Sequence, residues 1–181
     1  MAEYRKVFGL GAEFESVAHL MRAAEKVRDA GFKVWDVHTP FPVHGMDKAM
    51  GLGKSWLSAP VLLGGTAGLI TAVGLTCIPS FSLYPVIVHG KPYDAATIPA
   101  FFPIYFELTV LFSAFTAVFT LMVMSQLPRW YHPVFNWERF SRFSTDGFFL
   151  IIEARDPKFS ENNTRALLEG IGGAHVTLIH D

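Results

Sequence analysis

Two long apolar runs dominate the pattern of hydrophobic and polar positions along the chain. They cover residues 57–78 and 104–127, contain no Lys, Arg or His, and hold Glu107 as their single Asp or Glu. At a rise of about 1.5 Å per residue, a helix made from either run is long enough to cross the roughly 30 Å hydrocarbon core of a bilayer. The pattern therefore predicts two transmembrane helices joined by a connection over residues 79–103.

Shorter periodic patterns precede the first run. Residues 7–14 read as a strand, and apolar residues then recur at three- and four-residue steps behind Ser16, which is a suitable N-cap. This spacing predicts an amphipathic helix that ends at Gly31, because glycine adopts the left-handed conformation common after helix C-termini. Residues 32–38 close the piece as a second strand, predicted to run parallel to the first.

The segment after the second run repeats this order. Residues 148–152 form a continuous apolar strand, Ser160 precedes a short helix, and residues 176–179 close the piece as a strand. We infer a weak internal repeat of two β-α-β halves. Such halves combine most simply into a four-stranded antiparallel sheet with two helices on one face, the ferredoxin-like arrangement. The predicted fold is an α+β membrane protein with a transmembrane helical hairpin inserted between the two β-α-β halves of a ferredoxin-like cytoplasmic domain.

The expected organisation follows from these elements. Pro128 and Pro133 forbid a continuing helix after the second run, so the chain is expected to turn there along the membrane surface. The predicted segments are the first half of the cytoplasmic domain at 1–45, a membrane-surface connector at 46–56, the first transmembrane helix at 57–78, an extracytoplasmic loop at 79–103, the second transmembrane helix at 104–127, and the second half of the domain at 128–181.

Basic residues flank the hairpin asymmetrically. The connection between the runs has one lysine, Lys91, and one acid, Asp94. The segments before the first run and after the second run carry more positive charge, at Lys48, Lys54, Arg129, Arg139 and Arg142. By the positive-inside rule, both termini are expected in the cytoplasm, with the chain crossing the membrane twice. The residues expected to anchor the hairpin at the inner interface are Lys54, Trp56, Arg129 and Trp130.

Composition narrows the possible chemistry. A formal net charge of −1 over 181 residues argues against binding of nucleic acid. The single cysteine, Cys77, excludes a disulfide framework and an iron–sulfur ligand set, and none of the seven histidines lies in either run, where a haem b would be held. We therefore expect no cofactor and no metal in this chain.

Two features of the runs are candidates for function. Gly64, Gly68 and Ala72 recur every four residues and so share one helix face, which would let another helix approach closely. Glu107 is a weak catalytic candidate, because a carboxylate in a membrane span is a functional hypothesis by default. It is expected about one turn inside the outer boundary, where anchoring at the interface or to a neighbouring protein is favoured over proton transfer.

Four ordered motifs identify a family that the chain resembles. They are TPFPVHG at 39–45, FELTVL at 106–111, LPRWYHPVFN at 127–136 and FFLIIEARDPKF at 148–159. Together they resemble the two-span D-subunit family of bacterial alternative complex III, a membrane quinol:cytochrome c or other acceptor oxidoreductase. The resemblance implies a small accessory subunit beside a multihaem cytochrome c, a monohaem cytochrome c, an iron–sulfur/molybdopterin-like subunit and two polysulphide-reductase-like membrane subunits. Haem c and iron–sulfur clusters would belong to these partners, and lipids would surround the hairpin.

Three functions remain open at this point. The first is a structural and assembly subunit of that electron-transfer complex, which would make the chain a non-catalytic part of an enzyme. The second is a regulatory module that senses a ligand, for which the candidate residues lie near strand ends at Asp36, His38, His180 and Asp181. The third is proton movement through Glu107, although neither run holds a second Asp or Glu, or any His, Lys or Arg, to relay a proton.

Overall fold

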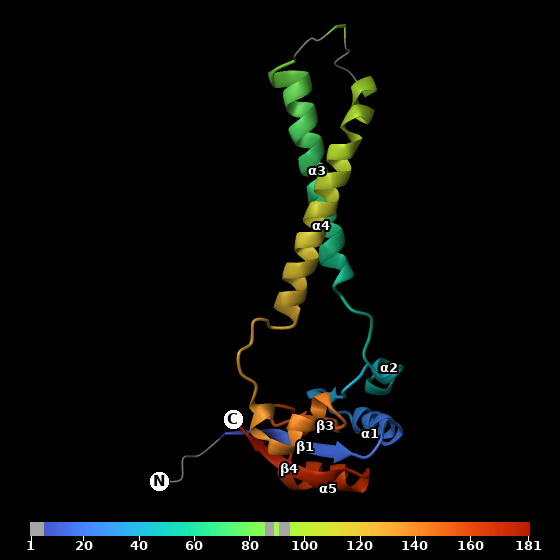
Figure 1. Ribbon diagram of the computed structural model, residues 1–181, viewed down its shortest axis with the longest axis vertical. Coiled ribbons are helices and arrows are strands. Elements are labelled where there is room, and N and C mark those ends of the chain that lie inside the picture. The colour runs from blue at the N-terminus through green and yellow to red at the C-terminus, as the bar shows by residue number, and fades with distance from the viewer. Residues whose placement is uncertain (1–5, 86–88, 91–94) are drawn as a thin grey trace. The chain divides into compact units, whose positions relative to one another are not determined.

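The chain folds as two compact units (Figure 1), and the computed structural model describes residues 6–85, 89–90 and 95–181. The sheet unit combines Met1–Gly53 with Trp130–Asp181, and the hairpin unit is Lys54–Arg129. Lys91 and Asp94, on which part of the predicted charge asymmetry rests, lie outside the described residues.

The sheet unit is built on a four-stranded antiparallel sheet. Its strands are β1 (Val7–Phe14), β2 (Trp35–His38), β3 (Phe148–Glu153) and β4 (Ala174–His180), in the spatial order β2-β3-β1-β4. Strand β1 pairs antiparallel with both β3 and β4, and β2 pairs antiparallel with β3. Strands β1 and β2 therefore run parallel to each other with β3 between them. The predicted combination of two β-α-β halves is confirmed.

Two helices cover one face of this sheet. Helix α1 (Val17–Asp29) begins after Ser16, whose Oγ accepts a hydrogen bond of 3.3 Å from the N–H of His19, and it ends before Gly31, which has φ of 82°. Helix α5 (Glu161–Gly170) follows Ser160 as expected, but the Ser160 side chain makes no capping bond. The contact is reversed there, because the Ser160 N–H donates to Thr164 Oγ1 at 3.1 Å.

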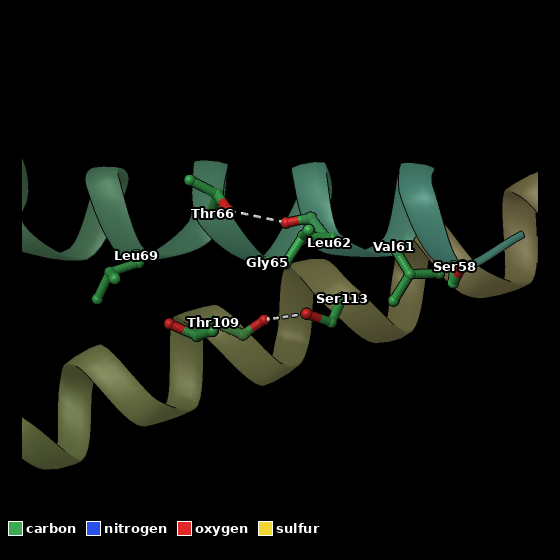
Figure 2. A pocket seen from close by; sticks show the side chains of 8 residues that line it. All are labelled: Ser58, Val61, Leu62, Gly65, Thr66, Leu69, Thr109 and Ser113. Atoms are coloured by element: carbon green, nitrogen blue, oxygen red, sulfur yellow. Dashed lines mark hydrogen bonds between the residues drawn. The ribbon is translucent and has the colours of Figure 1, made fainter.

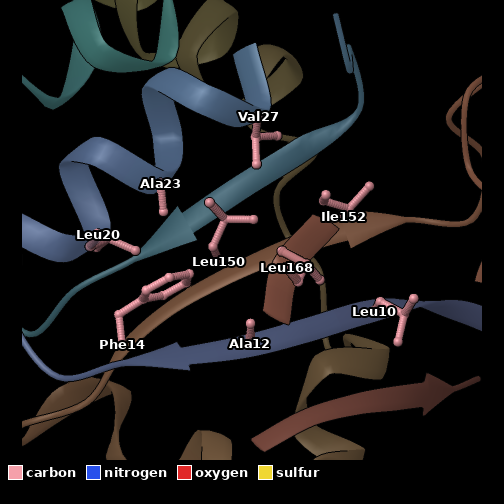
Figure 3. Packing of buried hydrophobic residues seen from close by; sticks show 9 residues of the cluster. All are labelled: Leu10, Ala12, Phe14, Leu20, Ala23, Val27, Leu150, Ile152 and Leu168. Atoms are coloured by element: carbon pink, nitrogen blue, oxygen red, sulfur yellow. The ribbon is translucent and has the colours of Figure 1, made fainter. Parts of the chain in front are cut away.

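The main core lies between the sheet and these helices. Leu20, Ala23 and Val27 recur at helical spacing on α1 and point toward the sheet (Figure 3), where Leu150 of β3 lies. Alternate residues of a strand point to the same face, so Leu10, Ala12 and Phe14 of β1 line one side of the sheet. The buried residues of this cluster are Leu10, Ala12, Phe14, Leu20, Ala23, Val27, Leu150, Ile152 and Leu168.

The second face of the sheet is covered by a segment predicted as a surface turn. Two short 3₁₀ helices, Pro133–Asn136 and Glu138–Ser144, form this cover. Trp137 is 6% exposed between them, and a Cβ added to Gly11 of β1 would lie only 2.5 Å from its ring. The buried residues of this second core are Val134, Trp137, Phe140, Phe149, Ile151 and Ile179. The sequence did not predict this burial, and the turn along the membrane surface stays a prediction.

The hairpin unit contains the two long apolar helices. Helix α3 covers Ser58–Ile78 and continues through a π-helical turn, Pro79–Leu83, so Pro79 does not end it. A 3₁₀ segment, Ala95–Phe101, leads directly into α4 (Phe102–Met124). The apolar helical stretches Ser58–Leu83 and Ala96–Met124 are both long enough to cross a membrane. The one remaining α-helix of the described residues, α2 (Met46–Met50), belongs to the sheet unit and begins after Gly45.

Candidate functional site

A seam of small residues joins α3 to α4. Gly64 faces Thr116, and a Cβ added to Gly65 would lie 2.5 Å from Ser113 Oγ. One turn further along α3, a Cβ on Gly68 would lie against the carbonyl oxygen of Leu108 and 2.9 Å from Phe112 Cβ. Because glycine brings no side chain into these contacts, the two helix backbones can approach closely here.

The seam continues toward the C-terminal end of α3. Ala72 is fully buried, and Thr76 is the last buried residue of the helix. The sequence-predicted face at Gly64, Gly68 and Ala72 therefore lies toward α4, and Gly65 and Thr76 extend it. The sequence placed these small residues on a face without identifying the helix that they meet. Their importance for assembly stays a prediction.

Hydroxyl groups along the seam bond mainly to their own helices. Thr109 Oγ1 donates to the carbonyl of Tyr105 at 2.6 Å, and Ser113 Oγ donates to the carbonyl of Thr109 at 2.8 Å. Thr76 Oγ1 bonds the carbonyl of Ala72 at 2.8 Å and also lies 3.2 Å from the Tyr105 hydroxyl oxygen on the other helix. These bonds satisfy the hydroxyls without water, as an apolar environment requires.

Open grooves lie beside this seam. Figure 2 shows the first, in which Thr109 and Ser113 of α4 lie across from Gly65 of α3. It has a volume of about 450 Å³, and the polar side chains that line it are those of Ser and Thr. Its lining residues are Ser58, Val61, Leu62, Gly65, Thr66, Leu69, Thr109 and Ser113. A second groove, of about 560 Å³, is lined by Phe112, Phe115, Thr116, Phe119 and Thr120 of α4. Among the described residues, neither groove is lined by an ionisable side chain.

Glu107 is exposed on α4 and does not line either groove. It precedes Thr116 by nine residues, about two and a half turns of a helix with 3.6 residues per turn. Thr116 contacts Gly64, so Glu107 lies on the side of α4 that faces away from α3. Within the described parts of the chain, no Lys, Arg or His forms an ion pair with it.

The four predicted interface anchors are all exposed. Trp130 is 96% exposed and Trp56 is 72% exposed, and Lys54 and Arg129 are also on the surface. Exposed indole rings and basic side chains at the ends of an apolar hairpin suit the headgroup region of a bilayer. Their contact with headgroups stays a prediction.

Arg139 and Arg142, two of the flanking basic residues, form ion pairs within the sheet unit. Both bind the buried carboxylate of Glu13, with Arg139 Nε 2.9 Å from Oε2 and Arg142 Nη1 2.7 Å from Oε1. Arg142 also forms a forked pair with Asp146, and its hydrogen bonds lower the pKa of that carboxyl below its ordinary value. Two carboxylates thus balance the two guanidinium groups.

The predicted sensor residues divide between two places. Asp36 and His38 line a small cavity on the second face of the sheet, together with His132 and Glu153, which sequence reasoning did not select. Burial lowers the pKa of His38, a trend that nearby Asp36 opposes and His132 reinforces. The cavity holds about 40 Å³, far below the roughly 300–1,000 Å³ of typical ligand pockets. It is too small for an organic ligand.

His180 and Asp181 do not line that cavity. Nδ1 of His180 is buried with no hydrogen-bond partner among the described residues, and the Asp181 N–H donates to the carbonyl of Lys6 at 2.8 Å. Among the residues that the structure describes, no group of three or more His, Cys, Asp or Glu side chains is placed to hold a metal ion.

Asp156 joins the two halves of the sheet unit, a role that the sequence did not reveal. Its Oδ2 accepts the N–H groups of Lys33 and Val34 at 2.6 and 2.7 Å, and its Oδ1 accepts that of Lys158 at 2.8 Å. Burial by itself would raise the pKa of Asp156, but these backbone donors outweigh it and lower the pKa. An Asp-Pro pair indicates a local turn. The sequence around it does not indicate that the Asp156 carboxylate accepts hydrogen bonds from backbone N–H groups more than 120 residues earlier.

Residues 8–178 match the family described as alternative complex III, ActD subunit. The match covers both β-α-β halves and the hairpin between them. No curated protein matches the chain significantly.

Proposed function

Since the chain belongs to the ActD subunit family of alternative complex III, a quinol-oxidising electron-transfer complex, we propose that it serves this complex as a cofactor-free structural and assembly subunit. In this proposal the hairpin crosses the bacterial inner membrane twice and packs against larger membrane subunits. The sheet unit remains in the cytoplasm with both termini. The observation that carries the proposal is the insertion of an apolar hairpin between two halves of one sheet.

Strand pairing supports the two-pass arrangement. The first half of the chain supplies β1 and β2, the second half supplies β3 and β4, and β1 pairs with both strands of the second half. These pairs require both halves on the same side of a membrane. Two spans return the chain to the side from which it left, so the sheet can form while the hairpin is inserted.

Orientation rests on the flanking basic residues. Lys48, Lys54, Arg129, Arg139 and Arg142 flank the hairpin, whereas the sequence of the connection has Lys91 alone. The positive-inside rule counts Lys and Arg whatever acids they pair with, so this difference favours a cytoplasmic sheet unit.

The proposed division of labour leaves redox chemistry to the partners. The family resemblance implies multihaem and monohaem cytochromes c, an iron–sulfur/molybdopterin-like subunit and two polysulphide-reductase-like membrane subunits. Helices α3 and α4 present long apolar surfaces to such membrane subunits, as suits a protein that joins others together.

The two alternative functions have less support. A ligand sensor needs a pocket with convergent polar groups, and the cavity at Asp36 and His38, at about 40 Å³, is far smaller than the roughly 300–1,000 Å³ of typical ligand pockets. A proton path needs a connected chain of groups that exchange protons. Thr109 and Ser113 donate to carbonyls of their own helix, and they lie on the side of α4 opposite Glu107.

Affinity purification from native membranes tests the proposal. An affinity tag on this chain should recover a quinol-oxidising complex that contains haem c, while the chain separated from that complex should show neither haem absorbance nor bound iron. Stoichiometric haem or iron in the separated chain would contradict the cofactor-free assignment. Recovery of the chain without any redox subunit would contradict the assembly role.

A further inference from the structure

One face of α4 carries a carboxylate in otherwise aliphatic surroundings. This outward face is turned away from α3 and consists of Glu107, Val110, Leu111, Ala114, Val118 and Leu121. At 3.6 residues per turn these positions share one side of the helix. All of them are exposed. Contact with lipid would explain the exposed aliphatic residues, but it does not explain the carboxylate.

Contacts with α3 show how deep Glu107 lies in the hairpin. The neighbouring residue, Leu108, has its carbonyl oxygen against Gly68, and Tyr105 reaches Thr76. Glu107 therefore lies level with the α3 segment between Gly68 and Thr76. The helix continues past Thr76 to Leu83, a further seven residues or about 10 Å. This alignment places Glu107 well inside the hairpin, at a level where α3 and α4 are both helical.

At this depth an unpaired carboxylate is unfavourable. Ionised groups in the apolar part of a membrane pair with other groups or face a polar interior, and the short Glu side chain has little reach toward headgroups. In the parts of the chain that the structure describes, Glu107 has no ion pair, and α3, the only long helix packed against α4 there, lies on the other side. The missing partner must come from outside these residues.

We propose that the outward face of α4 docks on a transmembrane helix of another protein of the complex, and that this helix carries a Lys or Arg that pairs with Glu107. This inference rests on the proposed assembly function and names the surface that performs it. Charge complementarity selects the occupant. A second copy of this chain, placed symmetrically, would bring two Glu107 carboxylates together, and like charges oppose such pairing. Ala114, two turns from Glu107, allows the partner backbone to come close.

Photo-crosslinking in native membranes tests the surface. A photoreactive residue is placed at Leu111 on the outward face, and the control is placed at Ile70, which is exposed on the side of α3 away from α4. We expect Leu111 to form an adduct with one membrane subunit and Ile70 to form mainly lipid adducts. Lipid adducts alone at Leu111, an adduct with a second copy of this chain, or equal protein adducts at both positions would each overturn the proposal.

Charge variants test the ion pair in the assembled complex. We expect Glu107→Lys to lower recovery of the complex on the order of tenfold, because it places like charges together, and Glu107→Gln to lower it less. The membrane content of each variant chain is measured in parallel, so a failure of insertion is recognised. Replacing the crosslinked partner's Lys or Arg with Glu exchanges the two charges. This exchange should restore recovery of the complex that contains the Glu107→Lys variant.

The outcomes separate the two levels of the proposal. Suppose that the wild-type chain co-purifies with redox subunits. Normal recovery of the complex with Glu107→Lys, or no rescue by the exchanged charge, would then overturn the docking face and leave the assembly role intact. If the wild-type chain does not co-purify with them, the assembly role itself fails. Full recovery of Glu107→Gln with lost quinol oxidation per complex would overturn docking in favour of proton transfer.

Discussion

Replacing Gly68 with alanine is the smallest change that should separate α3 from α4. The new methyl group would lie against the carbonyl oxygen of Leu108, which belongs to the backbone of α4, and 2.9 Å from Phe112 Cβ. A flexible side-chain end can rotate out of the way, but a helix backbone moves only as a unit. The helices must therefore shift apart along the seam.

The size of the effect follows from two opposing contributions. Overpacking of a close contact typically costs about 1–3 kcal/mol, and it cannot relax cheaply where backbone is the obstacle. Alanine also favours helix by up to about 1 kcal/mol relative to glycine. Gly74→Ala is the matched control, because a Cβ there would meet only Ile78 Cδ1, at 3.9 Å. The difference between the two variants isolates the clash.

We expect the hairpin of Gly68→Ala to be less stable than that of Gly74→Ala by about 1–3 kcal/mol, a factor of roughly 5 to 150 in the equilibrium. The assay is denaturant unfolding in detergent, followed by energy transfer between dyes at the two ends of the hairpin. Gly68→Leu should enlarge the effect, whereas the volume-conserving Leu69→Ile should be tolerated. Equal stability of Gly68→Ala and Gly74→Ala would refute close packing at this seam.

Three further predictions concern the sheet unit and the topology. Asp156→Asn should destabilise the sheet unit by about 1–3 kcal/mol, because an amide cannot accept hydrogen bonds from all three N–H donors. The control Asp29→Asn, at an exposed carboxylate, should change stability little. Hydrogen exchange of the β1 and β3 amides measures both effects. Burial lowers the pKa of His38, so the unfolded chain binds this proton more readily than the folded chain does. The stability of the sheet unit should therefore be full above the ordinary pKa of 6.5 and fall as the pH drops below it. A flat pH response, or one unchanged in His38→Phe, would contradict this. Cysteines at Asp94 and Asp181, in a Cys77→Ala background, should react with a membrane-impermeant reagent in intact cells at Asp94 only, and the reverse pattern would contradict a cytoplasmic sheet unit.

Local periodicity was enough to predict the regular elements. The three- and four-residue steps behind Ser16 and the glycine at Gly31 bound α1 as the structure has it. The similar order of elements in both flanks led to the correct sheet, because two β-α-β halves have few ways to pair. The cover formed by Pro133–Asn136 and Glu138–Ser144 was missed, since irregular aromatic spacing carries no helix or strand period.

Residues that act through distant partners were harder to predict. Gly64, Gly68 and Ala72 could be placed on a face by spacing alone, but their neighbour could not. The ion pairs of Arg139 and Arg142 could not be predicted, because Glu13 lies more than 120 residues away in sequence. The partners of Asp156 are equally remote. The depth of Glu107 depends on how α3 and α4 align, which the apolar runs do not encode.

The most direct test of the assembly role counts complexes and their turnover separately. In cells that lack this chain, intact complex is quantified by native electrophoresis, and quinol oxidation is measured per assembled complex. An assembly role predicts few complexes with near-normal turnover each, and restored numbers when the chain is supplied again. A normal number of complexes with turnover largely lost would contradict the assembly role and assign this chain a part in the reaction itself.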